Sequence, residues 1–170
     1  MKTVAVVVAG LLSVFVIACG GSDSDSDSTG SDDAATLSMA DAIAQGDQAC
    51  QDASDGLGPI EKSYTKAISS GDLAGAADEL DQIVELTQVR NEALADIQVE
   101  GADQDALDSY VANAEKTEEL TQSMSDSLRD EDIAGITDST QEIAKLNVEA
   151  QAYAQDFGFE RCGSGATGAA

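Results

Sequence analysis

The sequence has no histidine, no tryptophan and a single proline, and aromatic residues make up 4% of it. Histidine is the commonest general base and metal ligand, so its absence argues against most zinc centres and against di-iron bundles built on Glu-x-x-His pairs. The shortage of aromatic residues predicts a thin core of alanine and aliphatic side chains, in which helices can pack closely. We therefore expect neither a metal nor a cofactor.

Cations are also scarce: 8 lysines and arginines stand against 33 acidic residues, for a formal net charge of −25. Nucleic acids and anionic lipid head groups are recognised by cationic surfaces, so direct nucleic-acid binding is excluded. The acidity itself has three interpretations: a salt-rich habitat, cation binding, or plain solubility. Solubility is the simplest of the three.

The N-terminus has the pattern of an export signal. Residues 1–18 carry one positive charge, Lys2, before an apolar run of about 14 residues, shorter than the roughly 20 that span a bilayer. The run ends in Val16-Ile17-Ala18-Cys19, which resembles the end of a bacterial lipoprotein signal. This resemblance implies that Cys19 carries the lipid that holds the chain on the outer face of the cell membrane. A plain secretory signal or an uncleaved anchor are the alternatives.

Residues 20–36 contain Gly, Ser and Asp in place of large apolar residues, which predicts that residues 19–37 are the lipidated cysteine and a disordered acidic linker. Asp23, Asp25 and Asp27 match the first ligand positions of an EF-hand calcium loop. Ser28 and Ala34 then occupy the places of the turn glycine and the bidentate glutamate, so we interpret the segment as a spacer.

Residues 38–163 show apolar side chains at helical spacing and predict an all-α, up-down-up-down four-helix bundle, followed by a disordered tail over 164–170. Ser38 is a suitable N-cap for the first helix, which residues 56–59 (Gly-Leu-Gly-Pro) kink or break. Asp72 begins the second helix, expected to reach about Val99, and Asp103 begins the third. The fourth follows residues 129–131 and ends before Gly158.

Residues 71–86 align without gaps to residues 131–146. The shared positions pair Asp72 with Asp132 and Gly75 with Gly135. Either two helical hairpins share one ancestral pattern, or any capped amphipathic helix begins in this way. Both interpretations predict that the second and fourth helices begin at the same end of the molecule.

With Cys19 used for lipid, Cys50 and Cys162 remain as one pair in an exported protein, where disulfides persist. In an antiparallel bundle the end of the fourth helix returns to the start of the first, which lets the segment after Phe157 reach Cys50. We therefore predict a Cys50–Cys162 disulfide.

The layout of these cysteines resembles that of small exported four-helix lipoproteins of high-GC Gram-positive bacteria. In such proteins one cysteine sits inside the first helix, here within residues 41–53, and the chain closes on a Cys-Gly, here Cys162-Gly163. The turn between their second and third helices usually carries prolines, whereas residues 99–105 have none. The resemblance implies the fold and the location, and carries no activity with it.

Arg90 is the cation that falls near an apolar stripe: it lies seven residues after Ile83 and four before Leu94. We predict a polar, ligand-binding layer midway along the bundle around this arginine; its other members are Thr87, Asn91, Thr117, Thr121 and Asn147. In the alternative, Arg90 lies at the edge, packs its stem on Leu86 or Leu94, and meets an acid such as Glu118.

These features favour a non-enzymatic, membrane-anchored envelope lipoprotein that presents its bundle to an envelope protein or a small ligand. The alternatives are a carboxylate-based envelope hydrolase and a calcium-binding lipoprotein, neither of which has a diagnostic spacing.

Replacing Cys19 by Ala is expected to block signal removal at this site and to abolish labelling by a fatty-acid probe, because no other residue matches the lipoprotein pattern. The measurement is gel mobility and probe incorporation in cells that express the full chain. Continued labelling of the variant would show that the lipid is attached at another residue.

Overall fold

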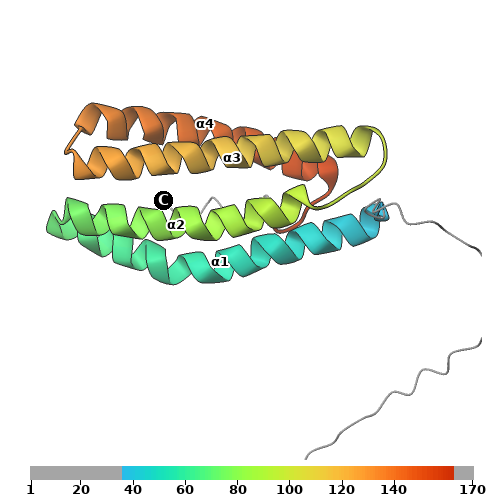
Figure 1. Cartoon of the computed structure of the whole chain (residues 1–170), viewed down its shortest axis with the longest axis horizontal. Helices are drawn as coiled ribbons and strands as arrows, with labels where there is room; N and C mark the ends of the chain where they lie inside the picture. The colour runs from blue at the N-terminus through green and yellow to red at the C-terminus, as the bar shows by residue number, and fades with distance from the viewer. Residues whose placement is uncertain (1–35, 163–170) are drawn as a thin grey trace, which may run out of the picture. The chain divides into compact units, whose positions relative to one another are not determined.

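The computed structural model describes residues 36–162, which form an all-α domain of four helices (Figure 1). The helices are α1 (Met39–Ser70), α2 (Leu73–Ala95), α3 (Ala102–Arg129) and α4 (Ile133–Phe157). They run alternately up and down, so the predicted four-helix bundle is confirmed. The predictions for the signal, for Cys19, for nearly all of the linker and for the tail lie outside the described residues.

Side-chain caps start three of the helices where the sequence predicts them. Ser38 accepts a hydrogen bond from the Asp41 N–H at the start of α1, and Asp72 accepts one from Gly75 N–H at the start of α2. Asp132 caps α4 through the Ala134 N–H. Each cap satisfies a backbone donor that has no partner inside the helix.

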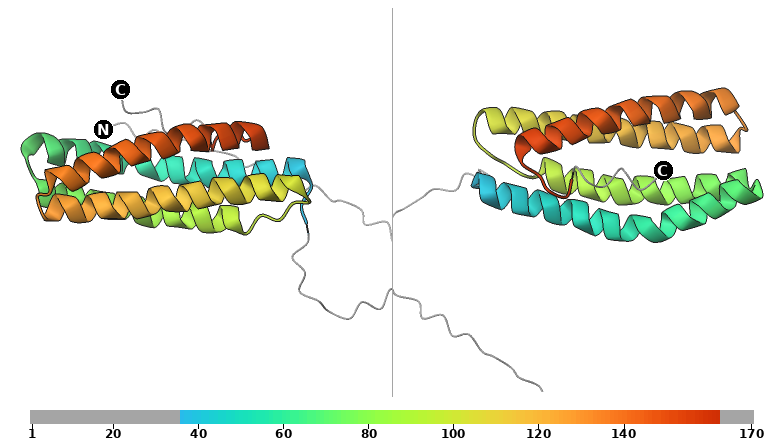
Figure 2. Two further views of the ribbon diagram at one scale, coloured as in Figure 1. Left: turned by 90° about the horizontal axis from the view of Figure 1, so that it is seen from above. Right: turned by 180° about the vertical axis from the view of Figure 1, so that it is seen from behind.

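The first helix passes through Pro59 without a break. The ribbon bends near its middle (Figures 1 and 2), in keeping with the predicted kink. Proline has no N–H to donate to the carbonyl four residues back, and its ring crowds that carbonyl, so the helix bends there. The alternative prediction, that the first helix breaks here and a separate helix begins at Pro59, is wrong.

The second helix is shorter than predicted, because it ends at Ala95 and the chain from Asp96 to Gly101 is a loop. Ile97 and Val99 are buried in this loop and are 0% and 7% exposed. Their apolar side chains pack between the helix ends, and alternation along an extended segment brings both inward. The Val99 N–H donates to the Gln104 side chain, which secures the loop against α3.

Nearly all close backbone contacts between helices join consecutive helices: α1 with α2, α2 with α3 and α3 with α4. Figures 1 and 2 show the result as two layers, with α1 and α2 in one and α3 and α4 in the other. The apolar core forms two clusters, which lie at the two ends of the bundle and each draw on both layers. One contains Leu94, Tyr110 and Phe157, at the end where α1 begins, and the other contains Ala77 and Leu128 near the two tight turns.

The two tight turns have the same backbone arrangement, 60 residues apart. Gly71 and Glu131 both adopt positive φ, at 77° and 55°. In both turns this residue donates its N–H to the carbonyl three positions back, and the next residue donates to the carbonyl five positions back. The aligned sequence segments therefore form equivalent hairpins, and α2 and α4 begin at the same end (Figure 1).

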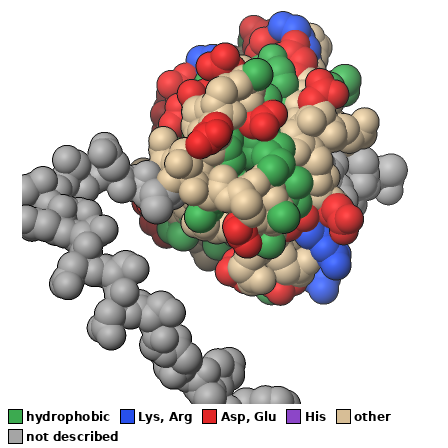
Figure 3. All heavy atoms as spheres, turned by 90° about the vertical axis from the view of Figure 1, so that its right-hand side faces the viewer, with side chains coloured by type: hydrophobic (Ala, Val, Ile, Leu, Met, Phe, Trp, Pro, Cys, Tyr) green, Lys and Arg blue, Asp and Glu red, His purple; other side chains and the backbone are tan. Residues whose placement is uncertain are grey.

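The opposite end of the bundle shows apolar side chains at its surface with acidic residues around them (Figure 3). Partly buried Leu37, Met39 and Ile43 extend the core toward this end. The Leu37 N–H donates to the Gln98 carbonyl and joins the start of the domain to the loop after α2.

Replacing Glu131 by Gly is expected to raise the free energy of unfolding by about 0.5 to 1 kcal/mol, because a non-glycine residue in the left-handed region carries a steric cost. Glu131 is exposed, so no packing is lost. The measurement is urea unfolding followed by circular dichroism.

The matched control is Gly71→Ala at the equivalent position of the first turn, where an added Cβ meets open space. We expect it to lower the free energy of unfolding by about 1 kcal/mol, since its only cost is conformational. A destabilising Glu131→Gly would contradict the equivalence of the two turns.

Candidate functional site

A cavity of about 550 Å³ lies between the four helices and the C-terminal segment. This volume is in the range of small-molecule sites, roughly 300 to 1,000 Å³. The lining extends from Cys50 to Thr65 on α1, from Leu80 to Arg90 on α2, from Tyr110 to Met124 on α3 and from Ile143 to Gln151 on α4. Arg161 and Cys162 complete it.

The cavity exists because the inner side chains of this region are too small to fill it. Ala53, Ala114 and Ala150 line it from three helices, together with threonines. The two apolar clusters border the cavity toward either end of the bundle.

The lining changes character along the bundle. Toward the disulfide it is polar, and we call the part formed by Arg90, Asn113, Asn147 and Gln151 the polar end. Toward the tight turns it is mainly apolar, and the apolar end is formed by Leu57, Tyr64, Leu80, Ile83, Met124 and Ile143. Glu61 and Thr65 of α1 also line this part of the cavity. From Arg90 to Leu80, ten residues along α2, the cavity extends roughly 15 Å at the helical rise per residue.

Arg90, the arginine that the sequence places beside the apolar stripe, lines the cavity and is partly buried. Its Nε and Nη2 donate to Asn91 Oδ1 at 3.1 and 2.8 Å. Asn91, 4% exposed, in turn donates from Nδ2 to Glu118 Oε2 at 3.0 Å. Glu118 therefore acts on Arg90 through Asn91, and no carboxylate of residues 36–162 forms an ion pair with this guanidinium.

This arrangement leaves part of the guanidinium unused. Two of the five N–H groups of an arginine are engaged by Asn91, which leaves three. Burial lowers the pKa of Arg90 below its ordinary value, against the opposing charge effects of Tyr110 and Glu118, yet a guanidinium stays charged at neutral pH. A partly buried positive charge without an ion pair carries part of the cost of desolvation, and a bound anion would offset that cost.

Two asparagines of the polar end also have unused hydrogen-bonding groups. Asn113 is 7% exposed, and its Oδ1 is a buried acceptor with no hydrogen bond. Its Nδ2 makes a long contact of 3.5 Å with Glu149 Oε2. Within the described part of the chain the Asn147 side chain makes no hydrogen bond. An unsatisfied buried amide oxygen is unfavourable, so Asn113 marks a place where a further hydrogen bond would be gained. Asn147 is partly buried, and its amide is free to bond a ligand.

The hydroxyl groups of the threonines in the middle of the cavity already donate hydrogen bonds within their own helices. Thr87, Thr117 and Thr121 each donate the hydroxyl proton to a carbonyl of the preceding helical turn. Their hydroxyl oxygens keep lone pairs and can still accept hydrogen bonds. Such a lining tolerates both the polar and the apolar part of a ligand.

The structure thus brings Arg90, Thr87, Asn147, Thr117 and Thr121 to one cavity, as the predicted polar layer requires. Asn91 differs, because it is buried beside the cavity and positions Arg90. Whether these residues bind a ligand stays a prediction.

Sequence reasoning missed Asn113, Tyr110 and Arg161, which also line the cavity. Asn113 could have been found, because it lies three residues after Tyr110 and four before Thr117 and so interrupts an inner stripe with an amide. Arg161 follows the last helix, and no periodicity predicts where such a residue lies.

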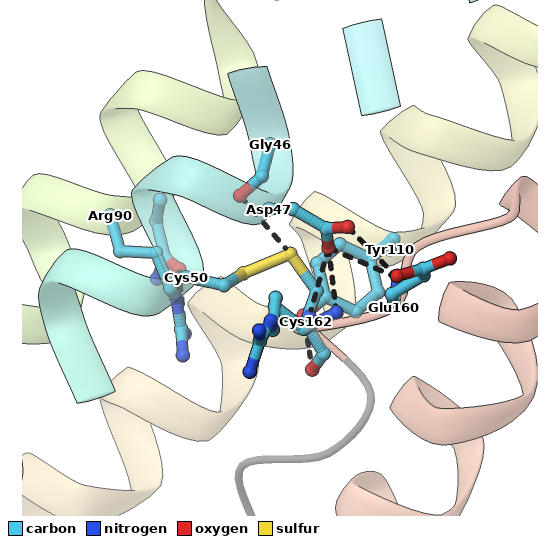
Figure 4. Close-up of a disulfide and its surroundings, with 9 residues drawn as sticks. Gly46, Asp47, Cys50, Arg90, Tyr110, Glu160 and Cys162 are labelled. Carbon is cyan, nitrogen blue, oxygen red and sulfur yellow. Dashed lines mark hydrogen bonds between the residues drawn. A yellow bond between two sulfur atoms is a disulfide. The ribbon is translucent and has the colours of Figure 1, made fainter. Parts of the chain in front are cut away.

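The predicted disulfide is present: Cys50 and Cys162 are joined across 112 residues of sequence (Figure 4). Gly158, at φ 99°, ends α4 in the left-handed conformation and turns the chain toward α1. Asp47 then holds this C-terminal segment, because its carboxylate accepts hydrogen bonds from the backbone N–H groups of Glu160, Arg161 and Cys162.

Aromatic side chains pack around the same crossing. The Tyr110 hydroxyl donates to the Cys162 carbonyl at 3.2 Å, and burial raises the pKa of this hydroxyl. Phe159 packs on Tyr110 and on Gly46, where a Cβ would lie 2.3 Å from its ring. The dashed line from Cys162 to Gly46 in Figure 4 marks a contact, since a disulfide sulfur has no proton to donate.

The acidic groups do not assemble into a metal site in the described residues, where no three potential ligands converge. Two carboxylates line the cavity, Glu61 from α1 and Glu118 from α3, and Glu118 already accepts a hydrogen bond from Asn91. None of the helices over residues 36–162 is long and apolar enough to cross a membrane.

Comparison with family models, curated proteins and solved structures gives no match.

Replacing both Cys50 and Cys162 by Ser is expected to lower the free energy of unfolding by about 2 to 4 kcal/mol, because the crosslink closes a long loop in the unfolded chain. The measurement is the urea midpoint of the mature domain with and without reductant. Reductant should lower the midpoint of the wild type and leave that of the double variant unchanged. A reductant-insensitive wild type, or two free thiols in the unfolded protein without reductant, would contradict the bond.

Proposed function

We propose that this protein is a membrane-anchored envelope lipoprotein that binds a small molecule inside its helical bundle and does not transform it. The lipid on Cys19 would hold the domain at the outer face of the membrane, and residues 19–37 would act as its tether. Net acidity supports a domain that stays clear of anionic lipid head groups while it is anchored.

The observation that carries this proposal is the cavity of about 550 Å³ with unused polar groups in its wall. A purely structural bundle fills its interior or lines a void with apolar side chains alone, because buried polar groups without partners are destabilising. Here a charged guanidinium and two amides lie at one end of the space. Their cost is offset when a ligand occupies it.

Small-molecule binding is better supported than docking of a protein partner, since the unused polar groups lie inside the bundle. The hydrolase alternative has less support. Glycoside hydrolysis needs a pair of free carboxylates flanking the bond, and Glu118 is engaged by Asn91. The calcium alternative would need several oxygen ligands on one ion, and the cavity wall offers two separate carboxylates.

The test uses the neutral fluorescent probe N-phenyl-1-naphthylamine with the purified mature domain. We expect saturable binding to one site per chain. Thr117→Phe, which fills the middle of the cavity, should abolish it, because Thr117 is part of the wall. Ala112→Phe is the matched control, since Ala112 lies on the same helix and is exposed.

Circular dichroism verifies that both variants keep their helices, and Ala114→Phe provides a second cavity-filling variant. Absence of saturable probe binding to the wild type would overturn the proposal. Equal binding by Thr117→Phe, Ala114→Phe and Ala112→Phe would overturn it as well, because the probe would then sit outside the cavity.

A further inference from the structure

Resting on the proposed function, the geometry points to a ligand class: a single-chain amphiphile with an anionic head group on Arg90, a hydrogen-bond donor beside that head for Asn113, and a hydrocarbon chain along the apolar end. The lining of the cavity changes from mainly polar to mainly apolar along the bundle. A molecule with the same gradient fits in one orientation.

The head-group position follows from the side chains around Arg90. Asn91 holds the guanidinium from one side through two hydrogen bonds and is itself held by Glu118, so the cation is oriented before a ligand arrives. The remaining N–H groups of Arg90 can donate to an anion. The strongest such interaction is the planar, two-hydrogen-bond pairing of a guanidinium with a carboxylate or a phosphate.

Asn113 defines a second feature of the head. It follows Tyr110 by one helical turn and precedes Glu118 by five residues, and Arg90 interacts electrostatically with both. Asn113 therefore lies at the level of Arg90 on the neighbouring helix. Its free Oδ1 needs a donor, which an anion lacks. A hydroxyl next to the anionic group supplies one.

The chain position follows from the other half of the wall. Six large apolar or aromatic side chains from all four helices surround the apolar end: Leu57, Tyr64, Leu80, Ile83, Met124 and Ile143. The roughly 15 Å from Arg90 to Leu80 sets the length of chain that is covered. The flexible side chains of methionine and leucine in this wall can change rotamer to fit a hydrocarbon chain.

Because the surface is acidic, selection of an anionic ligand over a neutral one must come from residues that line the cavity. At a net charge of −25 the protein repels anions at long range, so an anionic amphiphile gains nothing from the outside of the bundle. Any preference for an anionic over a neutral amphiphile must come from Arg90 or from Arg161, which also lines the cavity.

The experiment measures displacement of bound N-phenyl-1-naphthylamine by dodecanoate, dodecyl phosphate and 1-dodecanol, each below its solubility limit. In the wild type both anions should displace the probe at least tenfold more effectively than the alcohol. Arg90→Met should remove this preference without weakening the alcohol. Arg129→Met is the matched control, because it removes the same charge from an exposed pair with Asp78 and Asp81 outside the cavity.

The relative strength of dodecanoate and dodecyl phosphate distinguishes an acyl carboxylate from a phosphate head, and either result supports the anionic class. A second comparison tests Asn113. The wild type should prefer 3-hydroxydodecanoate to dodecanoate at least threefold, and Asn113→Leu should lose that preference. A preference that survives in Asn113→Leu would overturn the assigned role of Asn113.

Retained probe binding shows that Arg90→Met is folded, and Arg90→Gln replaces it if it is not. Equal displacement by anions and alcohol in the wild type overturns the ligand class, as does an unchanged preference in the Arg90 variant. In either case the proposed function stands while the probe itself still binds. If the wild type binds no probe, the proposed function fails first.

Discussion

The crossing of the C-terminal segment over α1 is the constraint on which this bundle depends. The backbones of α1 and α4, the two helices that would close a four-helix bundle, pack less closely than those of consecutive helices. The Cys50–Cys162 bond connects them covalently through residues 158–162. The Asp47 carboxylate adds charge-assisted hydrogen bonds to three successive backbone N–H groups of that segment. The bond and these hydrogen bonds add to the side-chain packing between α1 and α4 at this end of the bundle, where Ala42 and Cys50 share a cluster with Ala154 and Phe157.

A thin core and an internal cavity are two consequences of the same composition. Alanine and threonine at inner positions leave space that leucine or phenylalanine would fill, and aromatic residues are concentrated at one end, around Phe157 and Phe159. A crosslink compensates for the apolar contacts that such a core lacks. It acts largely on the unfolded chain, so it stabilises the fold without filling the interior.

The charges are divided between the surface and the interior. Arg129 pairs with Asp78 and Asp81 on the surface between α2 and α3, and its hydrogen bonds, with that of Ser125, lower the pKa of Asp81. Arg90 instead faces the cavity with an amide, and no carboxylate, in direct contact. In a chain with so few cations, an arginine that is partly buried and forms no ion pair with the described residues is the feature that most directly suggests a function.

The sequence alone determined the helices, their order and the crosslink, because these depend on local or countable properties: helical periodicity, cap residues and one remaining pair of cysteines. It also placed Arg90, Thr87 and Asn147 on inner faces, since helical spacing decides which side a residue occupies. Only the tertiary structure decided that α1 and α4 pack less closely than consecutive helices, that α2 ends at Ala95 so that Ile97 and Val99 can pack in a loop, and that the Asn113 side-chain oxygen lacks a partner. These outcomes depend on how the sizes of side chains from different helices add up in three dimensions, which no single stretch of sequence contains.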